Sequence, residues 1–153
     1  ETFYWQERGR FSLVPINFSF PKGSSIIAWQ LWCCGDPVKR ITPFKYLKCS
    51  HMPSRNDAKR LSDFKYLCVT IENICKHRGD NRFSSVQSLR VEDANKMFLF
   101  AELHLPLKEL TAKVKETSRP SQVAWSTMVK YLRSYKDVAE YKEIVPTSKS
   151  KVN

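Results

Sequence analysis

A short apolar run over residues 26–37, ended by Gly-Asp-Pro, constrains the fold of this chain more than any other feature of the sequence. Trp29 and Trp32 lie three residues apart in it, a spacing that places both on neighbouring parts of one helix surface. Gly35 can adopt the left-handed conformation that ends many helices, and the proline two residues later prevents the helix from resuming. The sequence therefore predicts a helix over 24–34 whose tryptophans anchor a core.

One short helix and three longer ones are predicted after this first helix, from their apolar spacing and their proline and capping signals. They cover residues 43–48, 55–78, 91–104 and 119–136. In the longest, apolar positions recur every three or four residues, as on one helix face: Leu61, Phe64, Cys68, Ile71 and Cys75. The residues expected to face inward from the last two helices are Val91, Ala94, Met97, Phe98, Ala101, Trp125, Met128, Val129 and Leu132.

The two ends of the chain differ in character from its middle. Residues 1–23 roughly alternate apolar and polar side chains, and Pro15 and Pro21 limit any sheet there to edge-like pairing. We expect this segment to form an extended arm. Residues 137–153 lose the hydrophobic pattern, and we expect a basic, mobile tail. The sequence thus predicts one mainly α-helical domain over 24–136, with an extended N-terminal arm and additional helices toward the C-terminus.

The composition favours a folded chain in a reducing compartment. A length of 153 residues with 42% hydrophobic content is enough for one core. The cysteine count of five is odd, and Cys33 and Cys34 are adjacent in an apolar helix. Buried, reduced thiols explain this pattern better than a disulfide framework does. No apolar run approaches the ~20 residues of a membrane span, so no membrane partner is expected.

Positive charge is concentrated in one part of the chain. The net charge is +11, and residues 38–82 hold eleven Lys and Arg against four Asp and Glu. Such a distribution favours a polyanionic partner, which can be DNA, RNA, an acidic membrane or an acidic protein.

The strongest candidate site lies at the start of the helix over 55–78 and comprises Arg55, Asn56, Lys59 and Arg60. Free amides at a helix N-terminus favour phosphate, and Arg and Asn side chains can read guanine and adenine edges. Three helices of which the third presents such residues follow the logic of a helix-turn-helix or Myb-like domain. We expect further phosphate contacts from the cations that precede this helix, which are Lys39, Arg40, Lys45 and Lys48.

A second candidate face lies on the helix over 119–136 and comprises Arg119, Gln122, Ser126, Lys130 and Arg133. It can act as a second groove-contacting helix or a phosphate clamp, or it can be the ordinary outer face of an amphipathic helix. The predicted DNA-binding set includes the cations of this face, Arg119, Lys130 and Arg133.

The sequence shows none of the motifs that are typical of the enzymes and structural metal sites considered. The chain contains no Gly-x-Ser-x-Gly motif, and its four glycines form no phosphate-cradling loop. The pairs Cys49-x-His51 and Cys75-x-His77 lack the spacing of structural zinc sites, and Cys75 belongs to an apolar helix face. We therefore expect no enzymatic activity, no cofactor and no bound metal.

Several short motifs carry a resemblance to known families, among them Gly9-Arg10-Phe11, Phe20-Pro21-Lys22, Lys59-Arg60-Leu61 and Gln122-Val123-Ala124-Trp125. Over residues 9–132 the chain resembles a segment of proteins encoded by eukaryotic mobile elements. The Trp-x2-Trp-x2-Gly core, followed by Pro-Phe and Leu within residues 25–75, is similar to a C-terminal DNA-binding domain of fungal proteins. Together the resemblances imply a helix-turn-helix or Myb-like DNA-binding module of transposon origin, and they imply no catalytic residue.

Taken together, these features predict a nuclear protein whose basic helical domain binds double-stranded DNA. Two alternatives stay open. One is a protein-interaction module that binds an acidic partner. The other is binding of RNA or single-stranded nucleic acid through Tyr4, Trp5 and Phe11.

Overall fold

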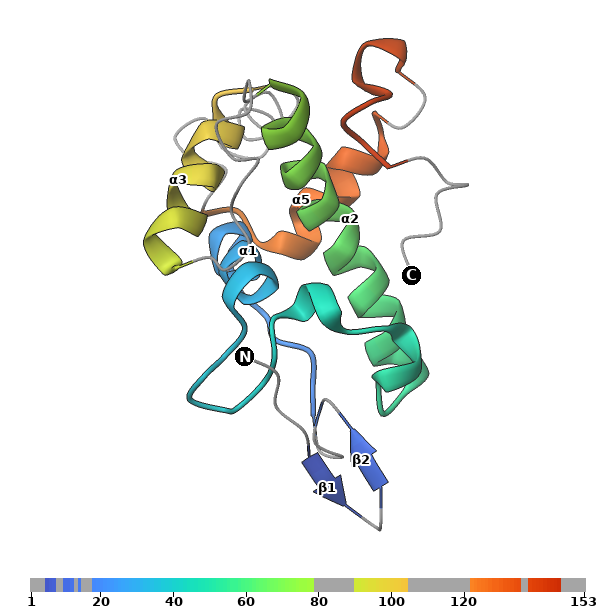
Figure 1. Ribbon diagram of the computed structural model, residues 1–153. Coiled ribbons are helices and arrows are strands. Elements are labelled where there is room, and N and C mark those ends of the chain that lie inside the picture. Colours follow the sequence, from blue (N-terminus) through green and yellow to red (C-terminus); the bar gives the residue numbers. More distant parts are fainter. Residues whose placement is uncertain are drawn as a thin grey trace.

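The fold is mainly helical, as predicted (Figure 1). The computed structural model describes residues 5–7, 10–12, 14, 18–78, 90–104, 122–135 and 138–146. The strands of this described part, β1 (Trp5–Glu7) and β2 (Arg10–Ser12), pair antiparallel with Gln6 opposite Phe11. Both strands fall in the segment predicted to be extended.

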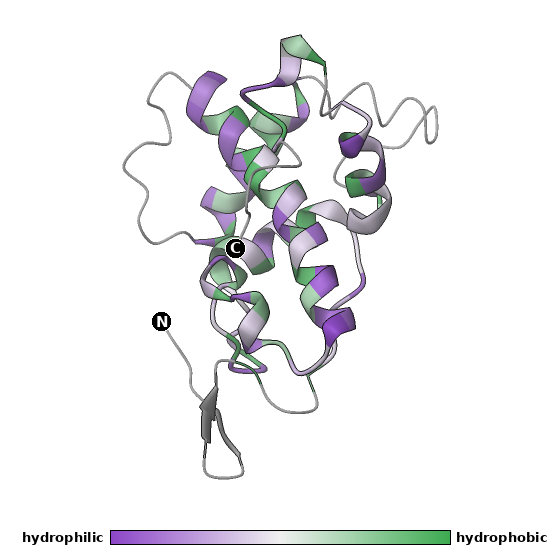
Figure 2. Cartoon of the chain, turned by 90° about the vertical axis from the view of Figure 1, so that its right-hand side faces the viewer, coloured by the Kyte–Doolittle hydropathy of each residue, from purple (hydrophilic) through white to green (hydrophobic). Residues whose placement is uncertain are grey.

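The helical core is built from four α-helices of the described residues: α1 (Ser25–Cys34), α2 (Arg55–Arg78), α3 (Val91–Glu102) and α5 (Trp125–Arg133). The long helix α2 contacts the other three, and α1 also packs on α3 (Figure 1). In α3 and α5 the hydrophobic and hydrophilic residues lie on different sides of the helix, whereas α1 is apolar over most of its surface (Figure 2). Among the described residues, no helix has the length and apolar character needed to cross a membrane.

An aromatic cluster at the centre of the core joins four separate segments. The Phe64 ring of α2 lies 5.2 Å from the Phe20 ring, 5.3 Å from the Phe44 ring and 5.3 Å from the Trp125 ring, centroid to centroid. Phe64 and Phe44 are almost completely buried. Such ring pairs contribute about 0.5–1.5 kcal/mol each beyond their buried area, so the cluster fixes the start of α5 and the segment before α1 against α2.

Helix α1 is tied to α3 through one of the two tryptophans that mark it in the sequence. Trp29 is buried, and its Nε1–H donates a 2.8 Å hydrogen bond to the carbonyl oxygen of Ala94. Beside it, Gln30 Nε2 donates to Asn95 Oδ1 at 2.7 Å. Trp32 is also buried, so both tryptophans belong to the core, as the sequence predicts.

We expect the substitution Trp29→Phe to lower the free energy of unfolding by about 2 kcal/mol, because it removes a buried hydrogen bond and part of a buried ring. Urea unfolding monitored by circular dichroism measures this change. Gln30→Ala is the matched control, since its bond to Asn95 is only part-buried, and its cost is expected below about 1 kcal/mol. Equal losses in the two variants would contradict the anchoring role of the indole.

The bounds and the buried face of α2 agree with the prediction. The helix covers Arg55–Arg78, and the five apolar residues expected on its inner face are all buried. The segment before it differs from the prediction. Instead of a helix over 43–48 there are two single turns of 3-10 helix, η1 (Phe44–Tyr46) and η2 (Cys49–His51). The reason is Leu47, which is extended (ψ 143°) and fully buried, so the core draws the chain away from a helical path.

The connection between α1 and α2, residues 35–54, is far longer than the three or four residues that join the helices of a helix-turn-helix. The fold is thus mainly helical, and the helix-turn-helix arrangement stays a prediction that these bounds do not confirm.

Helix α5 begins later than predicted. The predicted range was 119–136, but within the described residues the helix runs from Trp125 to Arg133. Ala124 instead forms an antiparallel bridge with Ser24, and Ser25 N–H donates to the Val123 carbonyl at 2.7 Å. These bonds hold the chain extended just before Trp125. The inner face of the helix agrees with the prediction: Trp125, Met128, Val129 and Leu132 are buried.

Two further expectations were wrong. Val91, expected to face inward, is 48% exposed, because the buried face of α3 begins one turn later at Ala94. Residues 138–146, expected within a mobile tail, pack on the core instead. After a turn of 3-10 helix, η4 (Ala139–Tyr141), Ile144 and Val145 are buried, and Asn73 Nδ2 of α2 donates to the Ile144 carbonyl at 2.9 Å.

Candidate nucleic-acid interface

The start of α2 is held in place by a local network of hydrogen bonds. Ser54 Oγ accepts a 3.1 Å hydrogen bond from the backbone N–H of Asp57 and donates one of 2.9 Å to Asp57 Oδ2. Asp57 Oδ1 accepts a third bond, of 3.3 Å, from the N–H of Phe20. Ser54 therefore caps α2, and the carboxylate of Asp57 also binds the segment that leads into the aromatic cluster. The first turn of α2 is rigid as a result.

Four side chains project from this rigid start into solvent: Arg55, Asn56, Lys59 and Arg60 are all exposed. Asp57 is the one acid among residues 54–60, and its carboxylate accepts hydrogen bonds from Ser54 and Phe20. Within the described part of the chain, none of the three cations forms an ion pair, whereas Arg78 pairs with Glu143 and Arg133 with Asp63. We call these four residues the α2 surface.

Positive charge continues from the α2 surface onto the turn η2, which packs on α2. Cys49 Sγ donates a 3.5 Å hydrogen bond to the Ala58 carbonyl and so ties the two elements together. Lys48, just before η2, is exposed. Lys65 of α2 is buried, and burial lowers the pKa of its ammonium group, with the charge of Lys48 adding to the shift.

His51 lies beside these lysines but does not add to their charge. Its Nδ1 accepts a 2.9 Å hydrogen bond from the Lys48 N–H, which leaves the proton of the neutral ring on Nε2. Partial burial lowers the pKa of His51, and the charges of Lys48 and Lys65 lower it further. Near neutral pH the ring is therefore uncharged, and the lysines supply the charge.

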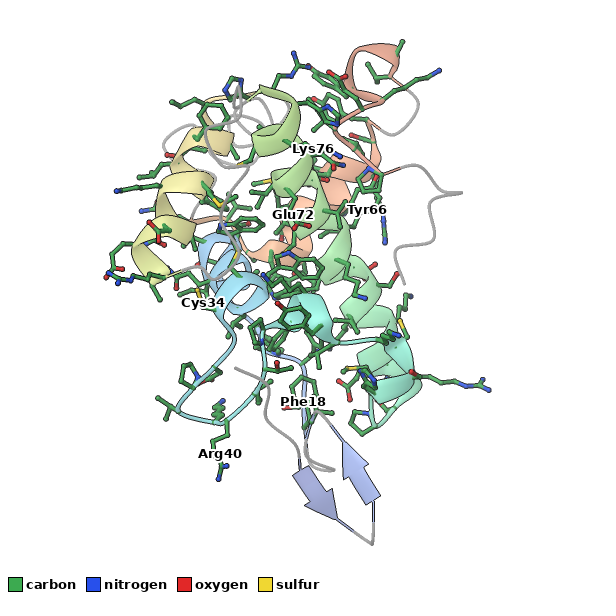
Figure 3. The ribbon with its side chains drawn as sticks, viewed as in Figure 1. Phe18, Cys34, Arg40, Tyr66, Glu72 and Lys76 are labelled. Carbon is green, nitrogen blue, oxygen red and sulfur yellow. The ribbon has the colours of Figure 1, made fainter. Side chains whose placement is uncertain are left out.

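The other predicted phosphate contacts lie on a separate part of the surface. Lys39 and Arg40 are exposed in the turn after α1, away from the start of α2 (Figures 1 and 3). Lys45 is half-buried, with its Nζ 5.2 Å from the centroid of the Tyr46 ring. The structure thus does not bring the predicted cations into one patch.

The second candidate face is only partly available. Gln122, Ser126, Lys130 and Arg133 are exposed, whereas Arg119 lies outside the described residues. The guanidinium of Arg133 forms an ion pair with Asp63 of α2, and its Cζ lies 5.1 Å from the centroid of the Tyr66 ring. Arg133 therefore ties α5 to α2, and its charge is already engaged.

A cavity of about 360 Å³ is lined by residues of α2 and of the start of α5. Arg60 of the α2 surface lines it, together with Lys22, Trp125 and Ser126. Lys22 was not predicted as a site residue. It is 38 positions from Arg60 in the sequence. No local sequence pattern could therefore show that the side chains of Lys22 and Arg60 line the same cavity.

The cysteines supply no comparable site. None of the five cysteines forms a disulfide, and no group of three or more His, Cys, Asp or Glu in the described ranges could hold a metal ion. Cys75 is buried between α2 and α3, where its Sγ donates to the Met97 carbonyl at 3.6 Å. Burial, with a smaller contribution from the Glu72 carboxylate, raises the pKa of the Cys75 thiol to about 12.

This raised pKa predicts a loss of stability in alkaline solution. The folded chain keeps the Cys75 proton up to about pH 12, whereas an unperturbed thiol loses it near 9.0. The contribution of Cys75 to stability is therefore complete below pH 9 and declines as the pH rises from there to about 12. We expect Cys75→Ala to show a shallower decline of the unfolding free energy between about pH 8 and 10 in urea titrations. Parallel declines in the two proteins would contradict the prediction.

No protein-family model, no curated protein and no solved structure matches this chain. Function is therefore inferred from the geometry and charge of the described residues.

Proposed function

We propose that this protein binds double-stranded DNA through the α2 surface. The observation that carries the proposal is the α2 surface itself, in which three cations and an asparagine project from a rigid helix start and no carboxylate of the described residues neutralises them. Exposed cations without partners release counterions from DNA when they meet its phosphates, and this release supplies most of the affinity.

The shape of α2 supports a groove-binding role. A helix with its side chains is about 10–12 Å across, which suits the major groove of about 12 Å. Arg55 and Asn56, at the tip, have the side chains that pair bidentately with guanine and adenine. Lys59 and Arg60, one turn further, lie where phosphates flank a helix in the groove. Lys48 on η2 extends the phosphate contact.

The remaining parts of the proposal follow from this mode of binding. Helix α1 and the Phe44 ring of η1 pack on the buried side of α2, and we give them the role of the supporting elements in a Myb-like domain. Duplex DNA as the partner makes the nucleus the expected location, and the resemblance to mobile-element proteins favours a transposon origin. The proposed activity is binding, without a catalysed reaction or cofactor.

A competition experiment tests the class of partner. Fluorescence anisotropy of a labelled duplex of about 25 base pairs, with unlabelled duplex, matching single strand and poly-glutamate as competitors, ranks the three polyanions at one salt concentration. We expect the duplex to compete best. Stronger competition by the single strand would favour the unpaired-strand alternative. Stronger competition by poly-glutamate than by the unlabelled duplex would favour an acidic protein partner and contradict the proposal.

A further inference from the structure

The turn after α1 is a closed and well-fixed structure. Asp36 and Ile41 exchange two backbone hydrogen bonds of 2.9 Å each. Between them, the Lys39 N–H donates to Asp36 Oδ1 at 3.2 Å, and the Arg40 N–H donates to the Pro37 carbonyl at 3.2 Å. We call residues 36–41 the basic turn. Its tip is held by bonds from both ends and from the Asp36 side chain.

The basic turn also stores backbone strain. Arg40 has a φ of 56°, and it is the one non-glycine residue of the described part with a positive φ. This conformation costs an arginine about 1 kcal/mol or more, and such strain is characteristic of functional sites. Glycine or asparagine would adopt it more readily, so the fold retains a cation here at a cost in stability.

The tip of the basic turn lies in solvent and combines an exposed apolar side chain with two cations. Pro37, Val38, Lys39 and Arg40 are all exposed, and the Val38 side chain is 93% exposed. A valine this exposed contributes almost nothing to the core. The tip therefore presents an apolar point with two cations directly after it.

A groove of about 450 Å³ runs along one flank of the basic turn. Lys39 and Arg40 line it on the side of the turn, together with Asp36, whose Oδ1 accepts the Lys39 N–H. Phe18, Leu31 and Phe44 contribute apolar walls. Apolar walls with cations at the edge complement a sugar–phosphate strand, whose deoxyriboses are largely apolar and whose phosphates are anionic.

We propose that the basic turn is a second DNA contact, which enters the minor groove next to the major groove occupied by α2. This inference rests on the proposed function. The minor groove is about 6 Å wide, too narrow for a helix but open to a single turn of chain. Arg40 and Val38 enter it, because arginine is drawn to its negative potential and apolar tips pack on its walls. Lys39 contacts a flanking phosphate, and one sugar–phosphate strand lies in the adjacent groove.

The two proposed contacts lie toward the same end of the helical core. The basic turn and the start of α2 are separate, yet both lie toward the lower end of the helical core in Figure 1. In Figure 3, Arg40 points away from the core at that end. Homeodomains combine a major-groove helix with a minor-groove contact from another segment in the same way.

Two synthetic duplexes test the inference, because inosine differs from guanine only in lacking the minor-groove amino group. Poly(dI·dC) therefore presents the major groove of poly(dG·dC) with an unobstructed minor groove. We expect the wild-type protein to bind poly(dI·dC) about five-fold or more tighter than poly(dG·dC) at low salt. The variant Val38→Ser/Arg40→Asn should bind both polymers equally. Asn at position 40 keeps the positive φ available, and Ser at position 38 changes only an exposed side chain.

The control variant Lys59→Glu/Arg60→Glu separates this inference from the proposed function. It should weaken binding to both polymers and leave the ratio of their affinities unchanged. Equal binding of the two polymers by the wild type, or an unchanged ratio in Val38→Ser/Arg40→Asn, would overturn the minor-groove contact alone. Absence of binding to both polymers would contradict the proposed function instead.

Discussion

Reversing two charges on the α2 surface, in the variant Lys59→Glu/Arg60→Glu, is expected to weaken binding to duplex DNA about 100-fold at ~50 mM salt. Both side chains are exposed, and neither pairs with a carboxylate of the described residues. Their replacement removes two phosphate contacts and brings two anions against the backbone. The slope of log affinity against log salt should become shallower by about two units. Anisotropy titrations of one duplex at several salt concentrations measure both quantities.

The matched control for this variant is Lys76→Glu/Lys96→Glu. It lowers the net charge of the chain by the same amount, from exposed positions on the last turn of α2 and on α3. We expect it to weaken binding by less than about five-fold, through the general field of the protein only. If the two variants weaken binding equally, net charge alone would explain the affinity and the α2 surface would have no special role.

The substitution Gly35→Ala is expected to lower the free energy of unfolding by about 3 kcal/mol or more. Gly35 has a φ of 71°, and a Cβ placed there would lie 2.5 Å from the Ile41 carbonyl oxygen and 2.7 Å from Pro43 N. Both are backbone atoms of the segment that carries the buried ring of Phe44. They cannot retreat without moving the aromatic cluster. Urea unfolding should show a lower midpoint with an unchanged slope.

Gly23→Ala is the control for this prediction. Gly23 also has a positive φ, 154°, but a Cβ there would meet only the Ile27 side chain, at 3.7 Å and beyond. Its cost should be limited to backbone strain of about 1 kcal/mol. We expect a larger loss of unfolding free energy for Gly35→Ala than for Gly23→Ala. Equal losses would contradict the view that the close approach of two backbone segments requires glycine at position 35.

Local sequence patterns could predict the elements whose bounds are set by neighbouring residues, but not those set by contacts between distant segments. The bounds of α2 follow from its three- and four-residue apolar spacing and from the cap at Ser54. The start of α5 could not be predicted in this way, because it depends on the bridge between Ser24 and Ala124, which are 100 positions apart. Likewise, Ile144 is buried in the core and Asn73 of α2 donates a hydrogen bond to its carbonyl, contacts that no local pattern indicates.

The same distinction applies to the candidate site. Arg55, Asn56, Lys59 and Arg60 could be grouped from sequence because one helix start presents all four. The engagement of Arg133 by Asp63 could not be foreseen, since the two lie 70 positions apart and meet only when α5 packs on α2.

The positive φ of Arg40 also has no counterpart in the sequence, where Gly, Asn or Asp would usually mark such a conformation. The basic turn therefore became visible as a distinct surface only in the structure.

The salt dependence of wild-type binding to a duplex tests the central claim most directly. The claim is that unpaired cations of the α2 surface, with Lys48, contact DNA phosphates. Three phosphate contacts, from Lys48, Lys59 and Arg60, predict that log affinity falls linearly with log salt with a slope of about −3, between ~50 and ~200 mM salt. Absence of duplex binding at the lowest salt, or an affinity that does not change across this range, would contradict the account.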